Sequence, residues 1–117
     1  MGFIRHHAFV VTGGNWSPKT IEDAHRLALA IFDYNQVSEL SGFTINGYRS
    51  FFIAPDGSKE GWEESAAGDI KRMEFKRRLR NEFRYEDKSS MVDWVEVFYG
   101  SDDGISEIVD HSKIGDD

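Results

Sequence analysis

The order of strand-like and helix-like patterns constrains the fold more than any other feature of this sequence. A run of β-forming residues at 5–12 precedes a segment with apolar residues at helical spacing, and a second helical segment lies between later strand-like runs. The order is strand, helix, two or three strands, helix, two strands. It predicts an α+β fold: a two-layer sandwich in which a mostly antiparallel sheet of four or five strands carries two helices on one face. A ferredoxin-like or split β-α-β variant with an extra terminal hairpin fits this order.

Local signals place the boundaries of these elements. Ser17 followed by Pro18 predicts a helix start, and that helix should extend from about Pro18 to Tyr34. Asn46-Gly47 predicts a hairpin turn, because this dipeptide readily supplies two positive φ angles. The expected elements that follow are strands 43–45 and 48–53 on either side of that turn, a possible third strand at 58–62, a helix at about 65–84, and strands 92–99 and 105–109.

Length and composition indicate one domain, residues 1–117, with the last few residues frayed. The chain has 117 residues and 39% hydrophobic residues, enough for one core. It contains no cysteine, which excludes disulfides, thiolate zinc sites and cysteine nucleophiles. No apolar stretch approaches the ~20 residues that span a bilayer. We therefore expect a cytoplasmic protein.

The second helical segment carries apolar residues on two sides. Ala66, Ile70 and Met73 share one side with Trp62, and Phe75, Leu79 and Phe83 project roughly opposite. Two explanations stay open at this point. Either the helix kinks near Met73, or an unbroken helix packs on its own sheet with one face and meets a second surface with the other. The second explanation predicts a homo-oligomer, with a dimer favoured, whose interface includes Phe75, Leu79 and Phe83.

Charge is strongly segregated along the chain. Residues 71–84 contain seven basic and two acidic residues, +5, whereas the remainder contains seven basic and nineteen acidic residues, −12. The basic side chains are candidate contacts for a partner or an anionic ligand. They are Lys71, Arg72, Lys76, Arg77, Arg78, Arg80 and Arg84. The acidic remainder disfavours nucleic acid as the partner, and pairing of these cations with the chain's own carboxylates is the simpler interpretation.

Aromatic residues near two turns suggest a ligand site. Trp16 lies in a glycine-containing link to the first helix, and Tyr48 and Arg49 begin the strand after Asn46-Gly47. An indole and a tyrosine beside a cation can hold a nucleobase, so these three residues with the basic segment form a candidate site for an anionic, nucleotide-like ligand at an oligomer seam. Core packing and a simple turn are the competing interpretations.

The sequence shows no catalytic signature. Adjacent His6 and His7 point to opposite faces of a strand, and His111 falls in the expected frayed tail, so we predict no metal site and no cofactor. The absence of a nucleophile, phosphate-loop or paired-acid motif favours a non-enzymatic protein.

Three segments resemble small uncharacterised proteins encoded in bacteriophage genomes: HHAFVVT, NGYRSFFIAPDGSKEGWEES and DWVEVFYG. The resemblance implies an accessory protein that acts in the host cytoplasm by occupying a host factor, here through the basic and aromatic residues named above. Sequestration of a small anionic ligand is the alternative. The partner's identity and the oligomer number do not follow from the sequence.

Overall fold

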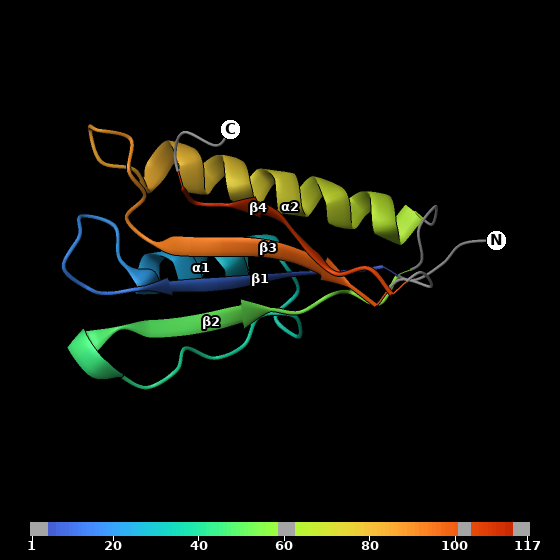
Figure 1. The fold of residues 1–117 in the computed structure, drawn as a ribbon, viewed down its shortest axis with the longest axis horizontal. Coiled ribbons are helices and arrows are strands. Elements are labelled where there is room, and N and C mark those ends of the chain that lie inside the picture. The colour runs from blue at the N-terminus through green and yellow to red at the C-terminus, as the bar shows by residue number, and fades with distance from the viewer. Residues whose placement is uncertain (1–4, 59–62, 101–103, 114–117) are drawn as a thin grey trace.

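The computed structural model describes residues 5–58, 63–100 and 104–113, and shows an α+β fold with two helices and a four-stranded antiparallel sheet (Figure 1). The sheet order is β2-β1-β3-β4, and each neighbouring pair is antiparallel. The elements are β1 (His6–Gly13), α1 (Ile21–Ile31), the short 3-10 helix η1 (Ile45–Gly47), β2 (Arg49–Ile53), α2 (Glu63–Glu82), β3 (Asp93–Tyr99) and β4 (Glu107–His111). This confirms the predicted fold class.

The hydrophobic core lies between one face of the sheet and the two helices. Phe9 of β1 is at its centre, where its ring lies 5.3 Å from Phe75 of α2, 6.1 Å from Trp94 of β3 and 6.3 Å from Phe32. Alternation along β1 directs Phe9 and Val11 into this core. The predicted first strand is therefore confirmed as a central strand of the sheet.

The first helix begins later than its sequence signals indicate. Thr20 is the N-cap: its hydroxyl accepts the Asp23 amide proton, and the Asp23 carboxylate accepts the Thr20 amide proton, so the two form a capping box. The predicted cap at Ser17 is wrong, because the Ser17 hydroxyl donates to the Lys19 carbonyl instead. The apolar face of α1 is confirmed as the face that packs on the core.

The predicted hairpin is correct in its turn and wrong in its first strand. Asn46 and Gly47 both have positive φ angles, 63° and 75°. Residues 43–45 do not pair as a strand, because the Thr44 side chain and amide both bond the Tyr48 carbonyl and close a tight turn. Since one described strand separates the two helices, the element order also differs from the ferredoxin-like order. The expected strand at 58–62 lies almost wholly outside the described residues.

The second helix is unbroken from Glu63 to Glu82, so the kinked alternative is wrong. Phe75, Leu79 and Phe83 are 0%, 0% and 2% exposed and belong to the core. Their assignment to an oligomer interface is wrong, because such fully buried side chains have no surface left for a partner. The exposed apolar side of the helix is the opposite one, at Ile70 and Met73. Neither α1 nor α2 combines the length and apolar character needed to cross a bilayer.

The last two strands form the predicted terminal hairpin. β3 begins one residue later than predicted and ends at the predicted Tyr99, whereas β4 begins two residues later than predicted and extends to His111. A β-bulge between Glu96 and Val97 shifts the register of this pair. His111 thus lies in a strand instead of the predicted frayed tail. The end of the expected tail, 114–117, lies outside the described residues.

Candidate functional site

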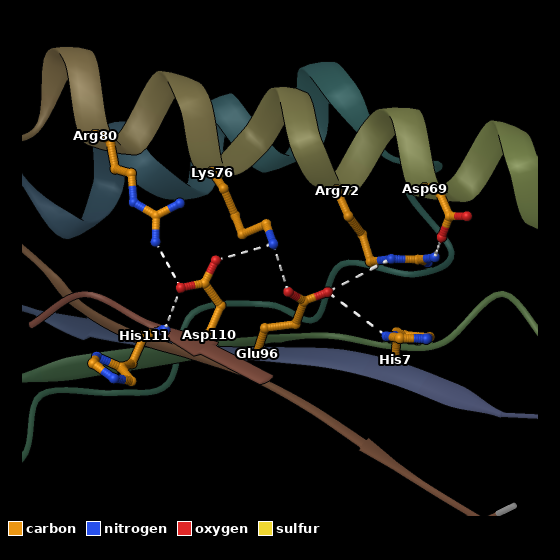
Figure 2. A network of polar contacts seen from close by, with 8 residues as sticks. All are labelled: His7, Asp69, Arg72, Lys76, Arg80, Glu96, Asp110 and His111. Atoms are coloured by element: carbon orange, nitrogen blue, oxygen red, sulfur yellow. Dashed lines mark hydrogen bonds and ion pairs between the residues drawn. The ribbon is translucent and has the colours of Figure 1, made fainter. Parts of the chain in front are cut away.

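The most extensive polar cluster of the described chain lies between α2 and strands β3 and β4 (Figure 2). Arg72, Lys76 and Arg80 are four residues apart and therefore form one row along α2. They project toward Glu96 of β3 and Asp110 of β4, which point from the sheet toward the helix. Phe75, Leu79 and Phe83 form the adjacent row, one residue removed, that enters the core. α2 therefore packs on the sheet with an apolar row and a cationic row side by side.

Glu96 is the centre of this cluster. It is 4% exposed, and Lys76 Nζ donates to its Oε1 at 2.8 Å. Its Oε2 lies 3.7 Å from Arg72 Nε, within ion-pair distance, and 3.7 Å from His7 Nδ1; both distances are too long for a direct hydrogen bond. Burial by itself raises the pKa of Glu96, but contacts with His7 and Lys76 outweigh that effect and hold its pKa below the ordinary value.

Asp110 extends the cluster along the helix. It accepts a hydrogen bond from Lys76 Nζ at 3.1 Å and one from Arg80 Nη2 at 2.6 Å. Burial raises the pKa of Asp110, while the hydrogen bonds from Arg80 and Lys76 lower it by more. The Arg80 guanidinium also lies over the Trp94 ring, 5.0 Å from its centroid. Because Lys76 bridges both carboxylates, the cluster is one connected unit.

Most of the predicted basic surface is thus already paired within the chain. Six of its seven cations lie within ion-pair distance of carboxylates: Lys71 with Asp33, Arg72 with Asp69 and Glu96, Lys76 with Glu96 and Asp110, Arg77 with Glu74, Arg78 with Glu82, and Arg80 with Asp110. The seventh, Arg84, lies just beyond α2, where its backbone bridges to Ser90. Three of these cations, Arg72, Lys76 and Arg80, pair with carboxylates of the sheet, whereas Arg77 and Arg78 pair within α2.

Glu96 and Asp110 are the residues that sequence reasoning missed. Alternation along β3 places Glu96 on the same face as Trp94 and Phe98, both of which are buried. An acid between two aromatic residues on a core-facing strand needs a cationic partner, because burying an unpaired carboxylate is costly. That pattern could have identified Glu96 from the sequence. It could not have shown which face Asp110 occupies, because the bulge shifts the register of β3 and β4.

A second candidate site lies at the end of the molecule where β1 ends and β2 begins. The Trp16 and Tyr48 rings are 5.1 Å apart and meet edge to face. The structure therefore brings these two predicted residues together. Arg49 points elsewhere: its Nε donates to the Ser41 carbonyl, Nη1 lies 3.5 Å from Glu22, and the guanidinium lies over the Phe43 ring. The predicted group of Trp16, Tyr48 and Arg49 is thus only partly assembled.

Close packing against glycine fixes the orientation of Trp16. A Cβ atom at Gly14 would lie 2.0 Å from the indole, so the ring rests directly on the Gly14 backbone. A Cβ atom at Gly47 of the η1 turn would lie 3.8 Å from the same ring, an ordinary van der Waals distance. Trp16 remains 58% exposed despite these contacts. We define the aromatic end as Trp16 together with residues 43–49, which include exposed Phe43, Ile45 and Tyr48.

The histidines make structural contacts. His25 Nε2 lies 2.8 Å from the Ser38 carbonyl and its ring meets Phe51 edge to face, while the His6 ring packs near Tyr99. Within residues 5–58, 63–100 and 104–113, no three histidine or acidic side chains are grouped so that they could hold a metal ion. The polar cluster has a histidine, a carboxylate and a lysine in contact, but it fastens α2 to the sheet.

Comparison of the chain with protein-family models, with curated proteins and with solved structures finds no match. The resemblance to phage-encoded proteins therefore stays a prediction, and function has to be argued from the site itself.

Proposed function

We propose that this protein is a non-enzymatic binding protein whose contact site is the aromatic end. The observation that carries the proposal is the exposed Trp16 ring, held edge to face against Tyr48 at 5.1 Å. Tryptophan, tyrosine and arginine are the residues most often found at the energetic centre of protein interfaces. The aromatic end contains all three types: Trp16 and Tyr48 contact each other, and the Arg49 guanidinium lies over the Phe43 ring at the margin.

Pre-organisation supports this assignment. A flexible side chain loses rotamer freedom when a partner immobilises it, which lowers affinity. Trp16 is already confined by the Gly14 backbone and the Tyr48 ring, so its ordering cost on binding is small. The turn beneath Tyr48 is likewise fixed, because Thr44 closes it with two hydrogen bonds.

The basic segment contributes less to this proposal than its sequence suggests. Lys76, Arg72 and Arg80 would have to leave Glu96 and Asp110 before they could bind another anion. Breaking those contacts would leave the buried Glu96 and the half-buried Asp110 unpaired. The partner expected from the resemblance is a host protein in the bacterial cytoplasm, and its contact with this chain is assigned to aromatic side chains.

A nucleotide-like ligand is the second candidate, and the exposed indole favours it because a base can stack on such a ring. Opposing it, Arg49 is within ion-pair distance of Glu22 and the α2 cations have internal partners, so the aromatic end supplies little positive charge for a phosphate.

Replacement of Trp16 tests the proposal. The variant Trp16→Ala is compared with Tyr34→Ala, a control that removes an aromatic side chain of 77% exposure outside this site. Cross-linked partners captured from bacterial lysate are quantified by mass spectrometry with each variant. We expect capture of the specific partner to fall at least tenfold with Trp16→Ala and to persist with Tyr34→Ala. Equal capture by both variants would contradict the proposal.

Thermal unfolding with mono-, di- and cyclic nucleotides tests the second candidate in parallel. A ligand at one hundred times its dissociation constant stabilises the folded chain by ~2.7 kcal/mol. A shift that Trp16→Ala abolishes would assign the aromatic end to a nucleotide instead of a protein.

A further inference from the structure

No helix covers the face of the sheet opposite α1 and α2 (Figure 1), although Ala8 on that face is itself fully buried. Both helices pack on the face that carries Phe9, Trp94 and Phe51, and in Figure 1 no helix crosses the front of β1, β2 and β3. Side chains alternate between the two faces along each strand, and paired residues on neighbouring strands share a face, so the strand pairing identifies the residues on this side. We call this set the open face: His6, Ala8, Val10, Thr12, Ser50, Phe52, Asp93, Val95, Val97, Tyr99, Ile108 and His111. Its one acidic residue, Asp93, lies at the end of β3, opposite Thr12.

The centre of the open face is apolar and uncharged. Phe52, Val10 and Val95 are neighbours across three strands, and Val97 pairs with Ile108 in the next row. Val10, Phe52 and Ile108 are 42%, 38% and 62% exposed. No Asp, Glu, Lys or Arg belongs to these two rows, although such residues make up 30% of the chain. The sheet thus keeps its buried charges on the helix side and presents an apolar surface on the other.

We infer that a second copy of this chain covers the open face and forms a symmetric dimer by packing sheet on sheet. This inference does not depend on the function proposed for the aromatic end. A strongly charged partner finds no opposite charge in the central rows, whereas the same rows of a second copy can pack on them without burying a charge there. Asp93 lies outside these rows, at the end of β3. Repulsion between two chains of net charge −7 acts at long range and is screened by salt.

The size of the open face suits such an association. Each strand residue occupies about 16 Å² of a sheet plane, from ~3.3 Å along the strand and ~4.8 Å between strands, so the four strands present roughly 400 Å² per copy. Accessible surface follows the relief of the side chains and exceeds this planar value. Two copies therefore approach the ~1,000 Å² that a specific interface needs. We expect a dimer that dissociates in the micromolar range.

A second copy cannot pair with the outer edge of β2, because that edge is already occupied. At this end of the sheet, the open face is the surface left for association. The amides of Ser38 and Ser41 donate to the carbonyls of Phe52 and Ser50, and the Phe52 amide donates to the Ser38 hydroxyl. The outer edge of β2 is therefore occupied by the chain's own segment 36–44. A second copy cannot extend the sheet there, but it can stack on the open face.

Sedimentation of the unmodified chain and of two matched variants tests the inference. Ile108→Asp introduces a charge into the open face, and Ile70→Asp introduces the same charge on the exposed side of α2, where isoleucine has a similar 67% exposure. Between about 1 and about 100 micromolar, we expect the unmodified chain to approach twice its 13.4 kDa mass. Ile108→Asp should weaken the dimer at least tenfold, and Ile70→Asp should leave it unchanged.

Cross-linking supplies a test with milder substitutions. The chain has no cysteine, so Val10→Cys and Leu29→Cys each introduce a single thiol, at positions that are both 42% exposed. A short bismaleimide that spans the ~10 Å between packed sheets should link Val10→Cys into dimers and leave Leu29→Cys monomeric.

Three results would overturn the inference. One is an unmodified chain that stays monomeric throughout the concentration range. Another is a dimer that Ile70→Asp disrupts and Ile108→Asp does not, which would assign the contact to α2. The third is a monomer whose Ile108→Asp variant loses a different bound protein, which would assign the open face to that protein.

Discussion

Lys76 Nζ lies 2.8 Å from Oε1 of Glu96, and this contact joins the middle of α2 to the middle of β3 across a buried boundary. The same ammonium reaches Asp110 at 3.1 Å. One cation thereby satisfies two carboxylates from two strands. The polar cluster acts as a clamp that sets the position of the helix along the sheet, next to the apolar row that Phe75 and Leu79 place in the core.

Removing the clamp's shared cation should destabilise the fold. Lys76→Met keeps a long apolar stem but leaves Glu96 with weaker compensation, so we expect the free energy of unfolding to fall by about 2–3 kcal/mol. Urea denaturation measures the change. Arg77→Met is the matched control, because Arg77 pairs with Glu74 on the exposed side of the same helix, and it should leave the unfolding midpoint unchanged. Similar midpoints for both variants would show that the clamp is not a source of stability.

Acid should weaken the clamp. The pKa of Glu96 lies below its ordinary value of 4.5, since contacts with His7 and Lys76 outweigh the effect of burial, and the pKa of Asp110 is also lowered. Depressed folded-state pKa values stabilise the fold above the unfolded values, and that stability is lost as pH falls through the folded ones. We expect the free energy of unfolding to decrease from about pH 5 to about pH 3.

A Glu96→Gln variant isolates the contribution of Glu96 to that acid response. Its stability should depend less steeply on pH in this window, because glutamine does not titrate. The ionisable groups that surround the position are otherwise retained: Arg72 and Lys76 from α2, His7 from β1 and Asp110 from β4. An unchanged slope, measured by urea unfolding at several pH values, would refute the assigned role of Glu96.

The elements with the clearest local patterns were predictable, and those set by tertiary contacts were not. β1, β3 and the apolar face of α1 follow directly from alternation and helical spacing. The missing strand at 43–45 could not be foreseen from Asn46-Gly47, because the turn is closed by Thr44 on the Tyr48 carbonyl. Pairing of basic residues with the chain's own carboxylates was the simpler interpretation of the charge pattern, but its partners on β3 and β4 depend on strand order and a bulge.

The two apolar sides of α2 illustrate the same limit. Helical spacing separates Phe75, Leu79 and Phe83 from Ile70 and Met73, but it does not tell which side faces the sheet. Basic residues lie close to Phe75, Leu79 and Phe83 in the sequence, and they made this side of the helix look like the exposed one. In the fold, Arg72, Lys76 and Arg80 are half-buried beside their carboxylate partners, so this charged row adjoins the core instead of facing solvent.

Phe75→Ala should therefore weaken the monomer itself. Phe75 is fully buried, and its ring contacts Phe9 and Phe32, so truncation leaves a cavity that costs about 3–5 kcal/mol. Met73→Ala, two residues away at 64% exposure, should change little. Urea unfolding at several protein concentrations measures both. If Phe75→Ala lost stability only at protein concentrations at which the chain self-associates, Phe75 would belong to an interface after all.

Gly14→Ala should disassemble the aromatic end without unfolding the protein. A methyl group there would lie 2.0 Å from the indole, so the Trp16 ring must leave its position and lose contact with Tyr48. Because Trp16 is largely exposed, the ring can move into solvent at small cost to stability. We expect nuclear Overhauser contacts between the two rings to disappear and partner capture to fall as it does for Trp16→Ala. Gly42→Ala is the matched control, since nothing lies within 4 Å of a Cβ atom at that glycine. Ring contacts that persist in Gly14→Ala would contradict the packing described for Trp16, and full partner capture without them would show that pre-organisation is not required for binding.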